Sequence, residues 1–209
     1  MKSRNTVNTA VFDFGGVLAD EGFTNGLHAI AGANNIDPGK FALEALELIY
    51  SSRYLTGESD EHSYWDAVRR HTGISGEDKD FRDTILEGFT LREWMFDMLM
   101  KLRRDGVRLF MLSDQTNWLD ELEERYHFFH LFEKVFNSYH TGKSKRDQSL
   151  FNDVLACMNL NPETVVFIDD TYDHIVRARN VGLKTIWFQG RKDFIKEMRQ
   201  YFPELKDKR

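Results

Sequence analysis

Five short apolar runs, separated by longer amphipathic stretches, constrain the fold of this chain more than any other feature. Each run has 4 to 6 residues and is rich in Val, Ile, Phe or Leu. Continuous apolar runs of this length are typical of parallel strands that helices cover on both faces. The runs lie at residues 9–14, 107–112, 135–139, 165–168 and 185–188.

Helical patterns fill most of the intervals between these runs. In the stretch 92–104, apolar residues such as Met95 and Leu99 recur on one stripe, and Gly106 follows as a stop signal. Strands that alternate with helices predict an α/β fold, here a doubly wound, Rossmann-like parallel sheet with right-handed crossovers. Further helices are expected at residues 118–126, 149–159, 175–181 and 192–201.

One long segment, residues 20–88, breaks this alternation. It contains no run typical of a strand, and helical patterns fall at residues 24–31, 39–53, 61–71 and 79–87. A chain of 209 residues is long enough for one α/β domain with a small insert. We therefore predict an α/β core of residues 1–19 and 89–209 and a small α-helical subdomain of residues 20–88.

Composition narrows the class of protein. A net charge of −6 without a basic stretch argues against a nucleic-acid partner. No run of about 18 apolar residues predicts a membrane-spanning helix, and the basic start of the chain leads into no apolar segment typical of a signal peptide. The single cysteine, Cys157, cannot form an internal disulfide and lies on an apolar helical stripe. We expect a cytoplasmic protein in which Cys157 is a core residue.

Polar residues stand at the ends of four of the predicted strands. Asp13 stands at the end of the first run, Ser113 follows the second, and Lys145 comes shortly after the third. Asp169 and Asp170 directly follow the fourth. In open α/β sheets, ligands bind beyond the carboxyl ends of the strands. These five side chains are therefore expected in one crevice.

The residue types in this crevice predict a particular chemistry. Clustered carboxylates raise one another's pKa unless a cation lies among them, and an all-oxygen ligand set suits Mg²⁺ better than Zn²⁺. A lysine and a hydroxyl group beside a metal can hold the negative oxygens of a phosphoryl group. The pattern therefore predicts phosphoryl transfer, with one Asp free to act as the nucleophile.

The same residues resemble the four motifs of the haloacid dehalogenase (HAD) superfamily, in the subgroup with a helical cap inserted after the first motif. The four motifs appear in order, and the resemblance covers nearly the whole chain. They read Val-Phe-Asp13-Phe-Gly-Gly-Val-Leu, Leu-Ser113-Asp, Gly-Lys-Ser-Lys145-Arg-Asp and Phe-Ile-Asp169-Asp170. The resemblance implies an HAD-like phosphatase that is Mg²⁺-dependent and acts on a small soluble phosphate ester, a phosphorylated metabolite. Asp13 would form an aspartyl-phosphate, while Ser113 and Lys145 would bind the phosphoryl oxygens.

The resemblance also implies a metal site. Mg²⁺ would be bound by Asp170, by the carboxylate of Asp13 and by the backbone carbonyl of Gly15. Asp169 would support the metal, either directly or through another ligand. Asp173, further along, fits a helix cap and a site residue equally well.

Gly15 departs from the pattern of the family. Phosphatases of this family usually have a second Asp at this position, which protonates the leaving oxygen and then activates water. The absence of this Asp predicts that esters with good leaving groups, such as aryl phosphates, are hydrolysed faster than alkyl phosphates. It also leaves open an alternative, a catalytically weak or inactive relative that binds a phosphorylated ligand or a protein partner. A dehalogenase fits less well, because Asp169 and Asp170 indicate a metal that such chemistry does not use.

Overall fold

The computed structural model describes residues 6–205 and contains a five-stranded parallel sheet with the strand order β3-β2-β1-β4-β5. The strands are β1 (Thr9–Phe12), β2 (Arg108–Ser113), β3 (Lys134–Asn137), β4 (Val165–Asp169) and β5 (Lys184–Trp187). Each predicted apolar run contains most of one strand, so the predicted α/β class with a doubly wound parallel sheet is confirmed. Residues 1–5 form the basic start of the chain that entered the prediction about a signal peptide, and they lie outside the described residues.

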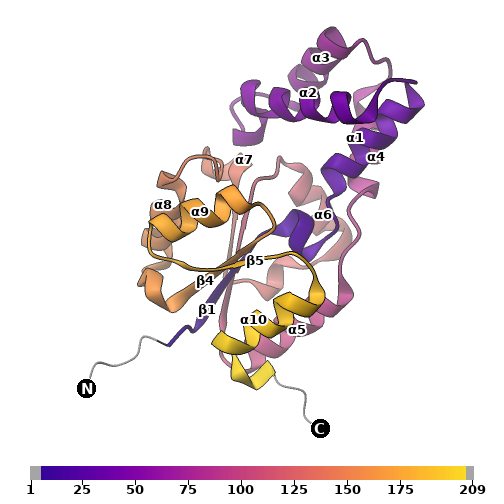
Figure 1. Cartoon of the computed structure of the whole chain (residues 1–209). Helices are drawn as coiled ribbons and strands as arrows, with labels where there is room; N and C mark the ends of the chain where they lie inside the picture. The colour runs from indigo at the N-terminus through magenta and orange to yellow at the C-terminus, as the bar shows by residue number, and fades with distance from the viewer. Residues whose placement is uncertain (1–5, 206–209) are drawn as a thin grey trace.

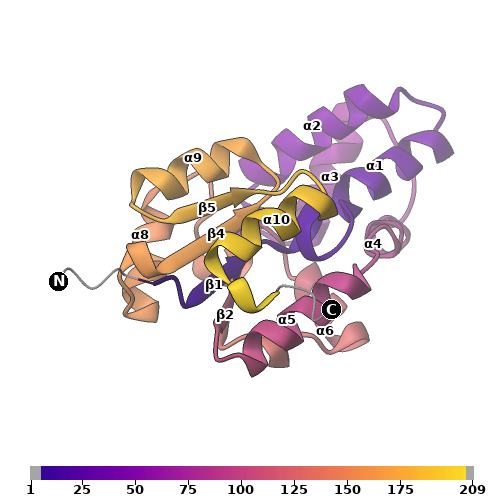
Figure 2. The ribbon, with the colours of Figure 1, turned by 60° about the horizontal axis from the view of Figure 1, so that its bottom comes forward.

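Helices cover both faces of the sheet, which explains why the strands are apolar throughout. On one face, Ala10 and Phe12 pack against three helices, whereas Val11 faces two helices on the other side. Figures 1 and 2 show the strands between these two helical layers. The first layer is α5 (Glu93–Arg104), α6 (Trp118–Tyr126) and α10 (Arg191–Tyr201), and the second is α8 (Ser149–Met158) and α9 (Tyr172–Asn180).

Four helices between β1 and β2 lie together beyond one end of the sheet (Figure 1). They are α1 (Gly22–Ala33), α2 (Pro38–Ser51), α3 (Glu61–Thr72) and α4 (Asp78–Glu87). Two of them begin at an N-cap aspartate. Asp37 accepts a hydrogen bond from the Lys40 amide at the start of α2, and Asp60 accepts one from the Ser63 amide at the start of α3. We call this segment, residues 20–88, the insert; its boundaries stay a prediction.

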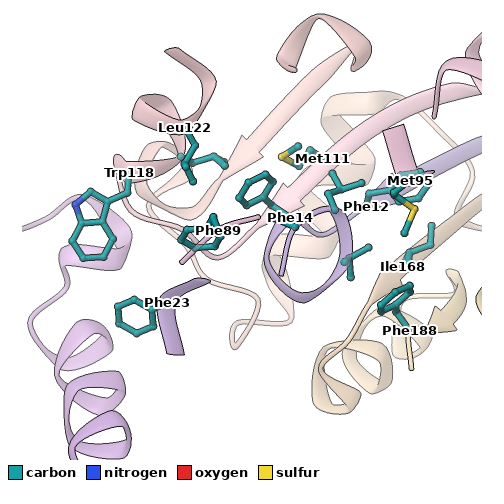
Figure 3. Close-up of a cluster of buried hydrophobic side chains, with 14 of the residues drawn as sticks. Phe12, Phe14, Phe23, Phe89, Met95, Met111, Trp118, Leu122, Ile168 and Phe188 are labelled. Atoms are coloured by element: carbon teal, nitrogen blue, oxygen red, sulfur yellow. The ribbon is translucent and has the colours of Figure 1, made fainter. Parts of the chain in front are cut away.

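One hydrophobic cluster joins the insert to the sheet (Figure 3). Phe14, just after β1, packs on Phe89 with ring centres 5.5 Å apart. Phe23 of α1 lies 6.1 Å from Trp118 of α6, again between ring centres. Because the cluster is continuous, the apolar contacts hold the insert against the helical layer that contains α6.

Two local features differ from the sequence prediction. The third strand ends at Asn137, whose side chain accepts a hydrogen bond from the Tyr139 amide and so starts the short helix α7 (Ser138–Thr141). Cys157 is exposed and not a core residue, because Phe151, Val154 and Met158 occupy the buried stripe of α8 and Cys157 lies beside it. Within residues 6–205, no helix combines the length and apolar character that crossing a bilayer requires.

Candidate active site

The carboxyl ends of β1 and β4 bring three acidic side chains together. Asp13 follows β1, Asp169 ends β4, and Asp170 follows it. The two strands are direct neighbours in the sheet. Asp13, Asp169 and Asp170 each offer a carboxylate oxygen, and these oxygens all lie within 4.8 Å of one another. The structure thus brings together the three acids that the sequence placed at this edge.

Lys145 lies buried between two of these acids. Its Nζ is 2.8 Å from Oδ2 of Asp13 and 2.6 Å from Oδ2 of Asp169, and the side chain is 1% exposed. Its backbone N–H donates to Oδ1 of Asp114 at 2.8 Å, which fixes the loop that bears the lysine. A buried ammonium group is tolerated when it is paired in this way.

Burial and charge shift the pKa values of the acids in different directions. Burial raises the pKa of Asp13 well above its ordinary value, the charge of Lys145 opposes this rise, and the charges of Asp169 and Asp170 add to it. Burial also acts to raise the pKa of Asp169, but Lys145 and His174 outweigh it and lower that pKa to about 2. Burial and the charge of Asp169 raise the pKa of Asp170. A bound cation would favour the ionised forms of Asp13 and Asp170.

Ser113, the last residue of β2, has a hydroxyl group without a partner. The residue is 1% exposed, and its Oγ makes no hydrogen bond to any other described residue. Buried hydroxyl groups are normally hydrogen-bonded, because an unmade bond costs about 1–3 kcal/mol. The hydroxyl group is therefore suited to a ligand that enters the crevice.

The glycines after Asp13 shape the crevice in two ways. Gly16 has φ +73°, and a Cβ there would lie 1.9 Å from Oδ2 of Asp170, so this acid packs directly against the glycine. Gly15 has φ −64° and ψ 140°, a conformation open to any residue. A Cβ at Gly15 would lie 3.2 Å from Oε2 of Glu21.

The oxygen-rich crevice fits a hard divalent cation. Asp13, Asp169 and Asp170 supply oxygen ligands only. Their combined negative charge exceeds the single positive charge of Lys145, which lies between two of them. The close packing of Asp170 on Gly16 holds its carboxylate beside the loop after β1. The side chains of these three acids thus fit a hard divalent cation, and the ligand set that the family resemblance implies for Mg²⁺ stays a prediction.

A cavity of about 610 Å³ lies over this crevice, between the strand ends and the insert. Asp13, Gly15 and Asp170 line it from the core. Six apolar or aromatic side chains from the insert and α6 form part of the remaining wall: Phe23, Leu46, Ile49, Tyr50, Leu55 and Trp118. The cavity therefore offers a charged floor and a partly apolar wall.

Contacts from α2 join the insert to the floor of the cavity. Tyr50 donates its hydroxyl hydrogen bond to Oδ2 of Asp114 at 3.3 Å. The guanidinium carbon of Arg146 lies 3.4 Å from the ring centre of Tyr50, and Arg146 also pairs with Glu47 at 3.4 Å. Since Asp114 also binds the Lys145 amide, α2 is linked to the lysine loop through one carboxylate.

Some of these residues were not predicted as part of the site. Asp114 adjoins Ser113 in sequence, and that adjacency was the available signal. His174 is another, and its Nδ1 lies 3.2 Å from Oδ1 of Asp169. Asp173, for which the sequence left a helix cap and a site role open, stands in the first turn of α9 and lines the cavity. Glu21 stands at the start of the insert, and none of the four sequence motifs includes it.

The chain matches a family model along most of its length. The model of the haloacid dehalogenase-like hydrolases matches residues 7–182. The sesquiterpene phosphatase astK of Aspergillus oryzae is 25% identical, over 85% of this chain and 88% of its own length. Glyceraldehyde 3-phosphate phosphatase of Pyrococcus furiosus is 31% identical, over 44% of this chain and 39% of its own length. The chain spans less than half the length of several curated relatives that it matches.

Solved structures show the same fold. The HAD family enzyme bt-2542 of Bacteroides thetaiotaomicron superposes with a TM-score of 0.76 at 22% identity, over 93% of this chain and 99% of that protein. A structure of the same enzyme with magnesium and inorganic phosphate gives a TM-score of 0.69 at 23% identity, over 86% and 93%. The match of the family model to residues 7–182 shows that this chain belongs to the haloacid dehalogenase-like hydrolases.

Proposed function

We propose that this protein is a Mg²⁺-dependent phosphohydrolase that acts on a small phosphate ester through an aspartyl-phosphate on Asp13. The observation that supports this best is the cluster of Asp13, Asp169 and Asp170 around the buried Lys145, with the unpartnered Ser113 hydroxyl group at the next strand end. Two relatives are named phosphatases, and a protein of the same fold was solved with magnesium and inorganic phosphate.

Each residue of the cluster has a role in this proposal. Asp13 attacks phosphorus, and the bond from phosphorus to the leaving oxygen breaks with its electron pair moving to that oxygen. The Phe14 amide donates to Oδ1 of Asp13 at 2.7 Å and so orients the carboxylate. Ser113 and Lys145 hold the phosphoryl oxygens. Water then attacks phosphorus, releases phosphate and frees Asp13.

The metal would be held by residues at the same edge. Asp13, Asp170 and the carbonyl of Gly15 would be its ligands, with Asp169 in support. When bound, Mg²⁺ supplies positive charge that offsets the negative charge of the phosphoryl group and the three acids. The cavity wall of Phe23, Ile49 and their neighbours would contact the organic part of a small phosphorylated metabolite.

A panel of phosphate monoesters tests this proposal. Phosphate release is measured with the purified protein in Mg²⁺ and again in EDTA. We expect Mg²⁺-dependent turnover of at least one ester. The alternative, an inactive relative that binds a phosphorylated ligand, is favoured by Gly15. It would gain support if no ester were hydrolysed while inorganic phosphate still bound.

Magnesium is expected to stabilise the fold, because it would bind an acid cluster that exists only in the folded state. At 100 times its dissociation constant, the gain in unfolding free energy should be about 2.7 kcal/mol. Asp170→Asn should remove most of this gain. Thermal unfolding of both proteins with and without Mg²⁺ measures the effect, and an equal gain in the mutant would rule out Asp170 as a ligand.

Ser113→Ala is expected to separate stability from activity. Removal of an unpartnered buried hydroxyl group should raise the unfolding free energy by about 1 kcal/mol. Loss of one donor to the phosphoryl oxygens should lower kcat by about 10²–10³-fold. Denaturant unfolding and steady-state kinetics give the two values.

Ser138→Ala is the matched control for stability. Ser138 is equally buried, but its hydroxyl group donates to the carbonyl of Gln115 at 2.9 Å. This substitution should therefore lower stability by about 1 kcal/mol. Equal destabilisation by both substitutions, or full activity in Ser113→Ala, would contradict the role given to Ser113.

A further inference from the structure

The proposed reaction needs a proton donor that the loop after β1 does not supply. The leaving oxygen of an alkyl phosphate departs poorly unless it is protonated, and general acid–base catalysis typically contributes about 10²–10⁴-fold. Position 15, two residues after the nucleophile Asp13, has no side chain. A proton donor for the leaving oxygen must therefore reach the same space from elsewhere in the chain.

The side chain closest to that space is a carboxyl group. A Cβ built on Gly15 would have Oε2 of Glu21 at 3.2 Å, Nε2 of Gln115 at 3.4 Å and a ring carbon of Phe89 at 3.6 Å. An amide and a phenyl ring do not exchange protons in the range where enzymes work. Of these three neighbours, only Glu21 can act as an acid and a base.

Glu21 has no structural role that would occupy its outer oxygen. It stands at the N-cap position of α1, and although its carboxyl group interacts with the backbone of Thr24, no capping hydrogen bond of normal geometry forms. Its other oxygen, Oε1, accepts a hydrogen bond from Thr24 at 3.5 Å. No ion pair involves Glu21 within residues 6–205, whereas its neighbour Asp20 pairs with Arg92 at 3.1 Å. Oε2 is thus the oxygen left to face position 15.

Glu21 also faces the right cavity and is held at its edge. It lines the same cavity as Asp13, Gly15 and Asp170. The backbone N–H of Asp20 donates to the Thr90 carbonyl at 2.9 Å. The residue before Glu21 is therefore bound to the segment that follows the insert. This anchoring sets the position from which the carboxyl group enters the cavity.

We propose that Glu21 is the general acid and base of this site, replacing from the insert the carboxyl group that position 15 lacks. The proposal rests on the proposed phosphohydrolase function. In the first step, the carboxylic acid of Glu21 gives its proton to the leaving oxygen as the phosphorus–oxygen bond breaks. In the second, the Glu21 carboxylate takes a proton from the water that attacks phosphorus. Phosphate then leaves Asp13, and Glu21 is protonated again.

A rapid-mixing experiment on Glu21→Gln tests the proposal with two substrates, p-nitrophenyl phosphate and propyl phosphate. Nitrophenolate leaves without a proton, so the mutant should release about one nitrophenol per site in a fast burst. Steady turnover should then be about 10²–10³-fold slower than in the wild type, because no base activates water. Propyl phosphate should give no burst, and its turnover should fall by about 10²–10⁴-fold.

Glu87→Gln is the matched control, since Glu87 is an exposed carboxyl group at the end of α4 in the same insert. It should keep wild-type rates on both substrates. A Glu21→Gln protein with wild-type rates on both esters would overturn the proposal and leave the proposed function intact. A wild type that hydrolyses neither ester, nor any other, would overturn the proposed function and this proposal with it.

A rescue variant guards against a merely structural effect. Glu21→Ala removes the atom closest to a Cβ at position 15, and the φ of −64° at Gly15 accepts a side chain. Glu21→Ala with Gly15→Asp should therefore hydrolyse propyl phosphate at least about tenfold faster than Glu21→Ala alone. A folded double mutant with no gain, beside a Glu21→Gln protein that shows no burst, would count against Glu21 as the proton donor.

Discussion

Asp13→Asn is expected to lower turnover of every phosphate ester by about 10⁴–10⁶-fold, the range found when members of a catalytic triad are removed. An amide does not attack phosphorus under these conditions, so no phosphoryl-enzyme can form. The fold should survive, because the side-chain oxygen of an Asn can still accept the hydrogen bond that the Phe14 amide donates. Lys145 also keeps Asp169 as a partner. Phosphate release and the mass of the protein after rapid acid quench measure the two effects.

Asp97→Asn provides the control for this experiment. Asp97 is an exposed acid on α5, away from the strand ends. It should show wild-type turnover and, after rapid quench, the same mass increase of one phosphoryl group as the wild type. Comparable turnover in Asp13→Asn and the wild type would exclude covalent catalysis through Asp13.

Lys145→Met is expected to cause the largest loss of stability, about 3–5 kcal/mol, because it leaves the buried carboxylates of Asp13 and Asp169 without their cation. The side chains of Lys145 and Asp169 are 1% and 0% exposed, so water cannot replace the lost partner. Denaturant unfolding in EDTA measures this loss. Added Mg²⁺ should restore part of it, since it supplies positive charge to the same acids.

Lys143→Met gives a comparison two residues away. Lys143 pairs with Asp153 at 2.5 Å, but the lysine side chain is 38% exposed and that of Asp153 is 58% exposed. Such surface pairs contribute about 0–1 kcal/mol, so this substitution should be nearly neutral. Similar losses for the two lysines would show that the buried contacts of Lys145 do not stabilise the fold.

The strands could be predicted because their hydrophobic pattern has one cause. The residues of β1 and β4 are buried throughout, so two covered faces produced unbroken apolar runs. The helices of the insert could be predicted from the periodic spacing of their apolar residues, and in the structure Asp37 and Asp60 cap two of them. The turn after β1 could not, because Gly15 and Gly16 have no side chains and break any pattern.

Some residues of the site could likewise be predicted from the sequence, and others could not. Asp13, Ser113, Asp169 and Asp170 stand at strand ends, and parallel strands bring their carboxyl ends to one edge whatever the details of packing. Glu21 reaches the cavity only because the insert packs in a particular position beyond the strand ends. Such a contact depends on tertiary packing, for which a single sequence holds no periodic or motif signal.

The strand order has a consequence for how the molecule is made. β1 lies in the middle of the sheet, and its residues pair with residues 108–111 and 165–168. On the ribosome, β1 therefore has no neighbouring strand while the insert is synthesised, and the group of Asp13, Lys145 and Asp169 is complete only once β4 has emerged. Chains that end before β4 contain Asp13 but lack Asp169 and Asp170. The complete cluster of Asp13, Asp169 and Asp170 is thereby restricted to chains whose synthesis has passed β4.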